Sequence, residues 1–160
     1  MIKIGASLPS IKVKHLTPQG IEDIALDQFC QNKKVVVFGV PGAFTPTCSG
    51  KHAPGFLKVA DQLKSKGIDN IICLSVNDPF VMDAWGKCLN VDNKITMVAD
   101  HAGLATKSLG LEIDMSAPGL GLRSKRYSML VENGVVKKLF VEDEAGACDI
   151  SSGDHILNAL

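Results

Sequence analysis

The sequence predicts an α/β fold in which helices flank a central mixed β-sheet, within a single domain (residues 1–160). Three continuous, β-branched apolar runs have the length and composition of buried strands. They occupy residues 35–40, 71–76 and 95–99. Amphipathic segments separate these runs, as expected for parallel strands joined by helical crossovers. Asn133-Gly134 lies between two later apolar runs and predicts a closing hairpin.

The chain is expected to begin with an N-terminal β-hairpin. Residues 11–14 alternate apolar and charged side chains, residues 17–20 (Thr-Pro-Gln-Gly) form the turn, and residues 21–26 form the return strand. Asp27 is then expected to cap a short helix that ends at Cys30. We interpret Cys30 as a structural core cysteine, because its neighbours are not typical of a reactive site.

Two amphipathic helices are predicted between the apolar strands. The first has apolar side chains at i, i+3, i+4 and i+7 over residues 56–63, and Lys66-Gly67 would end it. Asp78-Pro79 would start the second. The expected apolar face of this second helix consists of Val81, Ala84, Trp85 and Cys88.

Shorter elements are predicted toward the C-terminus. A short helix over residues 104–109 precedes a flexible loop at 119–121, and the closing hairpin pairs residues 127–132 with 135–141. Asp154 is expected to cap a last helix that reaches Leu160. Two crossovers, a closing hairpin and a terminal helix together describe a thioredoxin-like α/β sandwich.

The composition excludes several classes of function. Seventeen basic residues balance seventeen acidic ones, so the charge does not favour binding to nucleic acid or to a membrane surface. No apolar run approaches the ~20 residues of a membrane span, and residues 1–7 lack the features of a signal peptide. Five cysteines without a Cys-x-x-Cys pair argue against a disulfide framework or a zinc site. We therefore expect a reducing, cytoplasmic location with mostly free thiols.

The most informative stretch is Val40-Pro-Gly-Ala-Phe-Thr-Pro-Thr-Cys-Ser49, which directly follows the first apolar strand. Pro41-Gly42 ends the strand, Thr45 is expected to be the helix N-cap, and Pro46 suits the first helical position. Cys48 then lies in the first helical turn. Free N–H groups and the helix dipole there favour a thiolate over a thiol, which indicates a reactive cysteine.

Pro54 falls inside the same helical region. Its missing N–H removes a hydrogen bond to the carbonyl of Gly50, so a kink or break is expected there. The helical turn that carries Cys48 would then be a short, separately mobile piece.

Residues 41–49 resemble the active-site signature of the peroxiredoxins, in particular the peroxiredoxin-5 (type II, atypical) branch of the AhpC/TSA-like thiol peroxidases. Three further segments, residues 51–56, 73–82 and 123–129, are similar to that branch in order and spacing. The resemblance implies reduction of hydrogen peroxide and alkyl hydroperoxides through a sulfenic acid on Cys48, without metal, haem or flavin. It also implies a homodimer with a role in antioxidant defence and redox homeostasis. The oxidised Cys48 would be reduced again by thioredoxin, glutaredoxin or glutathione.

Peroxide reduction needs an ionised sulfur, hydrogen-bond donors to the two peroxide oxygens and a proton for the oxygen that leaves. Cys48 supplies the sulfur, the Thr45 hydroxyl can contact both thiolate and peroxide, and Pro41 can pack over the sulfur to limit water access. The resemblance assigns the permanent positive charge to Arg126. We interpret the neighbouring Arg123 and Lys125 as residues of a solvated loop.

His52 lies one helical turn after Cys48 and keeps an alternative open, namely a Cys-His thiol hydrolase in which His52 is the general base. A redox-sensing switch that uses the same cysteine with little turnover is a further alternative. The remaining histidines, His15, His101 and His155, are isolated and are interpreted as structural or solvated.

The thiol that resolves the sulfenic acid is the least defined part of the prediction. Some members of the branch carry a second cysteine in the loop before the last helix. Cys148 lies in that region, although residues 142–152 do not match their motif. Cys73 matches another proposed resolving position but falls within an apolar strand. We favour an external thiol, glutathione or glutaredoxin, and keep Cys148 and Cys73 as alternatives.

Overall fold

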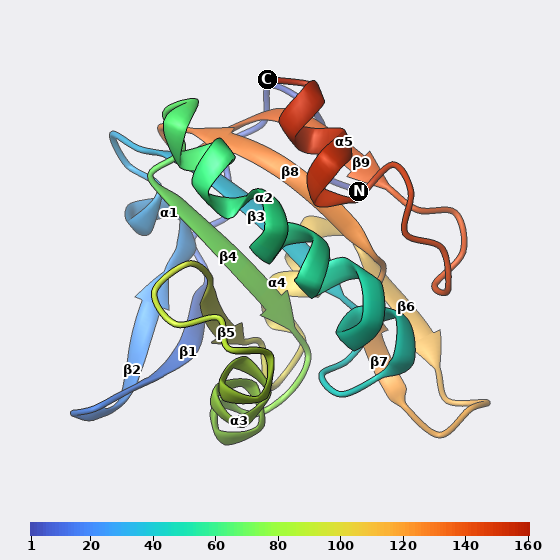
Figure 1. Cartoon of the computed structure of the whole chain (residues 1–160). Coiled ribbons are helices and arrows are strands. Elements are labelled where there is room, and N and C mark those ends of the chain that lie inside the picture. The colour runs from blue at the N-terminus through green and yellow to red at the C-terminus, as the bar shows by residue number, and fades with distance from the viewer.

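A computed structural model describes residues 1–160 and contains a seven-stranded mixed sheet and a separate two-stranded hairpin (Figure 1). The elements in chain order are β1 (Lys12–Thr17), β2 (Gly20–Ala25), α1 (Leu26–Phe29), β3 (Lys34–Val40), a π-helical turn η1 (Cys48–His52), α2 (Ala53–Ser65), β4 (Asn70–Ser75), α3 (Pro79–Leu89), β5 (Thr96–Ala99), α4 (Leu104–Leu109), β6 (Glu112–Met115), β7 (Gly121–Ser124), β8 (Tyr127–Glu132), β9 (Val135–Val141) and α5 (Gly153–Asn158). None of these helices combines the length and the apolar character that a membrane crossing requires.

The strands of the large sheet follow the order β2-β1-β5-β4-β3-β8-β9. The three predicted apolar runs form the parallel strands β3, β4 and β5, with Val37 paired to Ile72 and Phe38 paired to Cys73. β8 pairs antiparallel to β3, and β9 continues the sheet beyond it. The predicted mixed sheet flanked by helices is therefore confirmed.

Helices cover both faces of the sheet. Alternate residues of β3 point to opposite faces, so Val36 and Phe38 pack with α2, α3 and α5, whereas Val35 and Val37 pack with α1 and α4. Figure 1 shows α2 crossing the sheet diagonally with α5 beside it. The apolar runs are continuous because both faces of these strands are buried.

The hairpins confirm most of the turn predictions. β1 and β2 pair in register from Lys12–Ala25 to Thr17–Gly20, and Asn133-Gly134 turns between β8 and β9 with positive φ at both residues (49° and 77°). The loop predicted at residues 119–121 is instead the end of the turn of a β6–β7 hairpin. The sequence did not indicate this hairpin because its four-residue strands are half-exposed and lack an apolar run.

Helix caps were predicted with mixed success. Asp78 accepts a hydrogen bond from the Val81 N–H (2.9 Å), as expected for the start of α3. The predicted caps Asp27 and Asp154 are wrong, because each lies inside the first turn of its helix. Ala25 precedes α1 without a side-chain cap, and Ser152 caps α5 through the His155 N–H.

The buried face of α3 differs from the predicted one. Met82, Trp85 and Gly86 are buried, whereas Ala84 and Cys88 are exposed. Gly86 explains the difference, because its missing side chain lets α3 approach Met97 of β5 closely, and a Cβ there would come within 2.8 Å of Met97 Cγ. The helix is therefore rotated so that Gly86 faces β5, and Ala84 and Cys88 face solvent.

Candidate active site

The loop between β3 and the reactive helix has a fixed shape. Phe44 takes a positive φ of 61°, which is uncommon for a bulky residue, and the Ala43 N–H donates to Asn77 Oδ1 (3.0 Å). The Thr45 carbonyl accepts the Ser49 N–H (2.9 Å), so the helix begins at Thr45. Thr45 therefore holds the predicted N-cap position, although its hydroxyl donates to the Gly42 carbonyl (2.6 Å). The hydroxyl oxygen keeps its lone pairs for another donor.

The reactive cysteine begins a π-helical turn. The Ala53 N–H donates to the Cys48 carbonyl, five residues earlier, in place of the usual four. This irregularity lies directly before Pro54, where a kink or break was predicted. The chain remains helical from residue 46 to residue 65, so the predicted break into a separate piece is wrong. Trp85 Nε1 donates to Ser49 Oγ (3.0 Å) and ties this turn to α3.

Cys48 and Arg126 lie in contact although 78 residues separate them. Arg126 Nη2 is 3.3 Å from Cys48 Sγ, and both residues are buried. Register explains the contact: Arg126 immediately precedes Tyr127, which pairs with Gly39 at the end of β3. Nε and Nη2 also donate to the Ala145 carbonyl (3.2 and 3.0 Å), which fixes the plane of the guanidinium.

His52 contacts Arg126 and not the sulfur. Its Nδ1 accepts from Arg126 Nη1 (3.1 Å), and its Nε2–H donates to the Ser151 carbonyl (3.0 Å). Burial, reinforced by the adjacent guanidinium, lowers the pKa of His52 to about 3, so the ring is neutral at physiological pH. Both ring nitrogens are occupied by other groups. The geometry therefore does not support the alternative in which His52 is the general base of a thiol hydrolase.

The charge on Arg126 has no carboxylate partner. The salt bridges of the molecule do not include it, and its hydrogen-bond partners are a carbonyl oxygen, a neutral imidazole and Cys48 Sγ. A buried guanidinium without a counterion is unfavourable, so this arrangement favours an anion at the one remaining position, the sulfur. The free backbone N–H groups of Thr47 and Cys48, which donate to no backbone carbonyl, act in the same direction.

A cavity of about 260 Å³ brings three of the predicted site residues together. Pro41, Thr45 and Arg126 line it, with Met115 and Leu120 from the β6–β7 hairpin. Arg126 thus lines the cavity and also contacts Cys48 Sγ. The interpretation of Arg123 as a solvated loop residue is wrong: it lies on β7, is half-buried, and donates to the carbonyls of Leu120 (2.9 Å) and Pro41 (3.5 Å).

Comparison with known proteins places this site in a family. A family model described as Redoxin matches residues 3–157. Peroxiredoxin-2D of Arabidopsis thaliana is 50% identical over 140 residues, which are 88% of this chain and 86% of that protein. The structure of reduced Prx3 from Vibrio vulnificus in complex with hydrogen peroxide superposes with a TM-score of 0.95 at 46% identity, covering 99% of each chain. Peroxiredoxin 5 from Alvinella pompejana gives a TM-score of 0.86 at 33% identity, covering 99% of this chain and 97% of that one.

The chain belongs to the peroxiredoxins. It is thus a thiol peroxidase with a thioredoxin-like fold, as the resemblance of residues 41–49 implied. The predicted family and the predicted class of enzyme are both confirmed.

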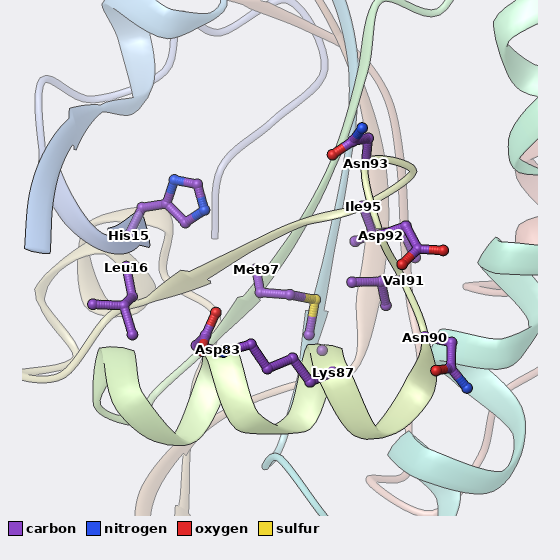
Figure 2. Close-up of a pocket in the computed structure, with 11 residues that line it drawn as sticks. His15, Leu16, Asp83, Lys87, Asn90, Val91, Asp92, Asn93, Ile95 and Met97 are labelled. Carbon is purple, nitrogen blue, oxygen red and sulfur yellow. Dashed lines mark ion pairs between the residues drawn. The ribbon is translucent and has the colours of Figure 1, made fainter. Parts of the chain in front are cut away.

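A larger cavity of this peroxiredoxin lies elsewhere (Figure 2). It measures about 680 Å³ and opens between β1, α3 and β5, with His15 and Leu16 on one side and Met97 facing α3. It contains no cysteine and shares no lining residue with the smaller cavity near Cys48. Asp83 and Lys87 on its rim neutralise each other in an ion pair (2.8 Å). The smaller cavity is lined by Arg126, which contacts Cys48, so thiol chemistry is expected there.

The two candidate resolving cysteines lie on different elements of the peroxiredoxin. Cys73 is fully buried in β4, and burial raises its pKa well above the usual value. Cys148 is buried in residues 143–152, here called the C-terminal loop, and burial raises its pKa as well. Neither forms a disulfide in this structure.

Two residues that hold the site were not predicted from the sequence. The Ser151 carbonyl accepts the hydrogen bond from His52, and the Glu142 carboxylate accepts the Ser151 N–H. The only signal that could have pointed to Glu142 is its place as the first of three acidic residues that follow an apolar strand. That signal is weak, because such residues are usually solvated.

Proposed function

We propose that this peroxiredoxin reduces hydrogen peroxide and small alkyl hydroperoxides with Cys48 as the nucleophile. The contact between Cys48 Sγ and a guanidinium that no carboxylate neutralises supports this proposal most directly. The thiolate attacks one peroxide oxygen, so an S–O bond forms as the O–O bond breaks. Sulfur is oxidised by two electrons to a sulfenic acid, and the leaving oxygen takes a proton to become water or an alcohol.

The residues around the sulfur would divide the remaining work. Arg126 stabilises the thiolate and the negative charge that develops on the peroxide oxygens. The Thr45 hydroxyl and the free N–H groups of Thr47 and Cys48 orient the peroxide. Pro41 excludes water from the cavity, and His52 fixes Arg126. Each of these roles agrees with the contacts described above.

Size and lining of the cavity favour small peroxides. A volume of about 260 Å³ accommodates hydrogen peroxide or a short alkyl hydroperoxide, and Met115 and Leu120 offer an apolar surface to an alkyl group. Prx3 of Vibrio vulnificus, which has the same fold, binds hydrogen peroxide in its reduced state.

An external thiol is proposed to reset the enzyme. Glutathione, alone or with glutaredoxin, would attack the sulfenic acid to form a mixed disulfide and release water, and a second thiol would then free Cys48. Thioredoxin is the alternative reductant. The raised pKa values of Cys73 and Cys148 support this proposal, because a protonated thiol is a poor nucleophile.

A homodimer is also part of the proposal. Phe44, Phe80 and Leu104 are large apolar side chains that remain exposed (55%, 62% and 59%), and the first two lie in the loop before Cys48 and at the start of α3. The bond from the Ala43 N–H to Asn77 ties these two segments together. An apolar surface of this kind is typical of a contact between subunits. The five free thiols agree with a reducing compartment such as the cytoplasm.

Turnover of hydrogen peroxide, with thioredoxin and glutaredoxin systems supplied in parallel, tests the proposal. The native protein should react faster than free cysteine by several orders of magnitude, which also distinguishes an enzyme from a slow redox sensor. Cys48→Ser should abolish turnover, because a neutral hydroxyl without a base is a poor nucleophile. Cys88→Ser, on the exposed face of α3, is the matched control and should retain it. Robust turnover by Cys48→Ser would contradict the proposal.

A further inference from the structure

Glu142 is a buried carboxylate directly after β9, and a single one of its oxygens accepts three hydrogen bonds. The donors to Oε1 are the Asp149 N–H (2.6 Å), the Ser151 N–H (2.9 Å) and the Ser151 hydroxyl (2.8 Å). The backbone N–H of Glu142 donates to the Arg126 carbonyl (2.9 Å). Glu142 is therefore tied at its backbone to Arg126 and at its side chain to the C-terminal loop.

The C-terminal loop in turn holds the groups around Cys48. The Ala145 carbonyl accepts two hydrogen bonds from Arg126, and the Ser151 carbonyl accepts one from His52. The Thr47 hydroxyl reaches the Gly146 carbonyl at a longer distance (3.4 Å). A continuous path of hydrogen bonds thus runs from Glu142 through Ser151, His52 and Arg126 to the sulfur.

We propose that Glu142 is a positioning residue for the peroxidase reaction, because its carboxylate holds the C-terminal loop in the shape that orients His52 and Arg126 against Cys48. The inference rests on the proposed function of Cys48. It adds a residue that touches neither sulfur nor peroxide and acts through the loop.

The part of the loop around Ser151 depends on Glu142, because the carboxylate accepts both the N–H and the hydroxyl of Ser151. Hydrogen bonds to an ionised carboxylate are stronger than neutral ones, and buried donors left without an acceptor are costly. Without the carboxylate, the bonds from Arg126 to the Ala145 carbonyl and from His52 to the Ser151 carbonyl would remain, but Ser151 itself would lose its anchor. The ion pair between Lys51 and Asp149 is exposed and contributes little. Loss of the carboxylate should therefore release the loop and admit water to His52.

Water at His52 would change its charge. The ring is enclosed by Phe38 of β3, Phe56 of α2 and the Ser151 carbonyl, and the charged group that faces it is Arg126. The Cys48 thiol lies one turn earlier on the same helix. Once hydrated, His52 should regain a pKa near the ordinary value of ~6.5. Its protonated form cannot accept the Arg126 N–H and would repel the guanidinium.

The test is an NMR titration of the imidazole of His52 together with the pH profile of the reaction with hydrogen peroxide. In the native protein the ring should remain neutral from pH 5 to pH 8. In Glu142→Ala it should titrate near pH ~6.5, and the second-order rate constant should fall roughly 10- to 100-fold at pH 7 and further below it. Glu144→Ala removes the same charge from an exposed position of the same loop and is the matched control.

Two further variants keep the test decisive if Glu142→Ala does not fold. Glu142→Asp retains the charge, but its shorter side chain moves the carboxylate away from the three donor groups of Asp149 and Ser151. It should give an intermediate rate and a detectable titration of His52. Glu142→Gln retains an acceptor and should recover most of the rate. Unchanged titration and rate in every folded Glu142 variant would overturn the proposal. Because the titration does not depend on turnover, this outcome differs from failure of the proposed function, which robust turnover by Cys48→Ser, or a native protein no faster than free cysteine, would indicate.

Discussion

Arg126 donates a hydrogen bond to His52 at 3.1 Å, so a permanent cation faces a ring that can accept this bond only while it is unprotonated. Their proximity makes protonation of the folded protein at this position unfavourable. The relationship has a consequence for stability as well as for catalysis.

Stability should fall as the pH drops below the pKa of an unfolded histidine. The pKa of His52 is about 3 in the folded protein and 6.5 in the unfolded chain, so the unfolded chain binds the extra proton between these values. Each pH unit in that window costs at most ~1.4 kcal/mol from this group. Urea unfolding at pH 7.5 and pH 5.0 should therefore show a loss that is about 2 kcal/mol larger in the native protein than in His52→Asn. Equal losses in both proteins would contradict the buried, neutral state of His52.

Replacement of Arg126 by Gln should slow the reaction with peroxide. The guanidinium is proposed to stabilise charge in the transition state, so the second-order rate constant should fall by about 10² to 10³. Stopped-flow measurement with hydrogen peroxide gives the value. Lys125→Gln, one residue earlier, removes the same charge without a contact to Cys48 and should react normally. A native rate in Arg126→Gln would show that the contact at 3.3 Å has no catalytic role.

The resolving thiol can be identified from one turnover. One equivalent of peroxide is added to fully reduced protein without a reductant, and disulfides are mapped by peptide mass. We expect a sulfenic acid on Cys48 that glutathione can trap, because Cys73 and Cys148 are buried thiols with raised pKa values. A Cys48–Cys148 or Cys48–Cys73 peptide that forms within the turnover would reject the one-cysteine cycle.

Gly39 and Tyr127 provide a test of the packing beneath the site. A Cβ on Gly39 would overlap the Tyr127 ring on the paired strand, so Gly39→Ala should destabilise the fold by about 1–3 kcal/mol or more. The buried Tyr127 hydroxyl has no hydrogen-bond partner. Tyr127→Phe should therefore be neutral or stabilise the protein by roughly 1 kcal/mol. Thermal unfolding measures both variants, and a large loss of stability in Tyr127→Phe would reveal a partner for the hydroxyl.

Local patterns predicted the elements of this fold because the dominant signals are local. The apolar strands and the Asn133-Gly134 turn each depend on a few adjacent residues. The β6–β7 hairpin was missed because its strands are short and half-exposed. The face of α3 was misplaced because Gly86 draws the helix toward Met97, which the periodicity of α3 alone does not show.

The site was predictable only in part for a similar reason. The stretch around Cys48 indicated a reactive sulfur, and the resemblance to a family supplied Arg126. The role of His52 depends on its contact with Arg126, 74 residues later in the chain. The role of Glu142 depends on contacts with Asp149 and Ser151, which lie seven and nine residues later in an irregular loop. No periodic pattern encodes such contacts, so only the folded structure reveals them.

The order of these residues along the chain also sets the order in which they are synthesised. Cys48 leaves the ribosome first, and Arg126 follows 78 residues later. At the usual ~5–20 residues per second, the nascent thiol exists for roughly 4–16 seconds without the guanidinium that contacts it in the folded protein. Glu142 and the C-terminal loop emerge later still. The cysteine is therefore synthesised before the groups that surround it in the folded protein, and it meets them only after a further 78 residues or more have been made.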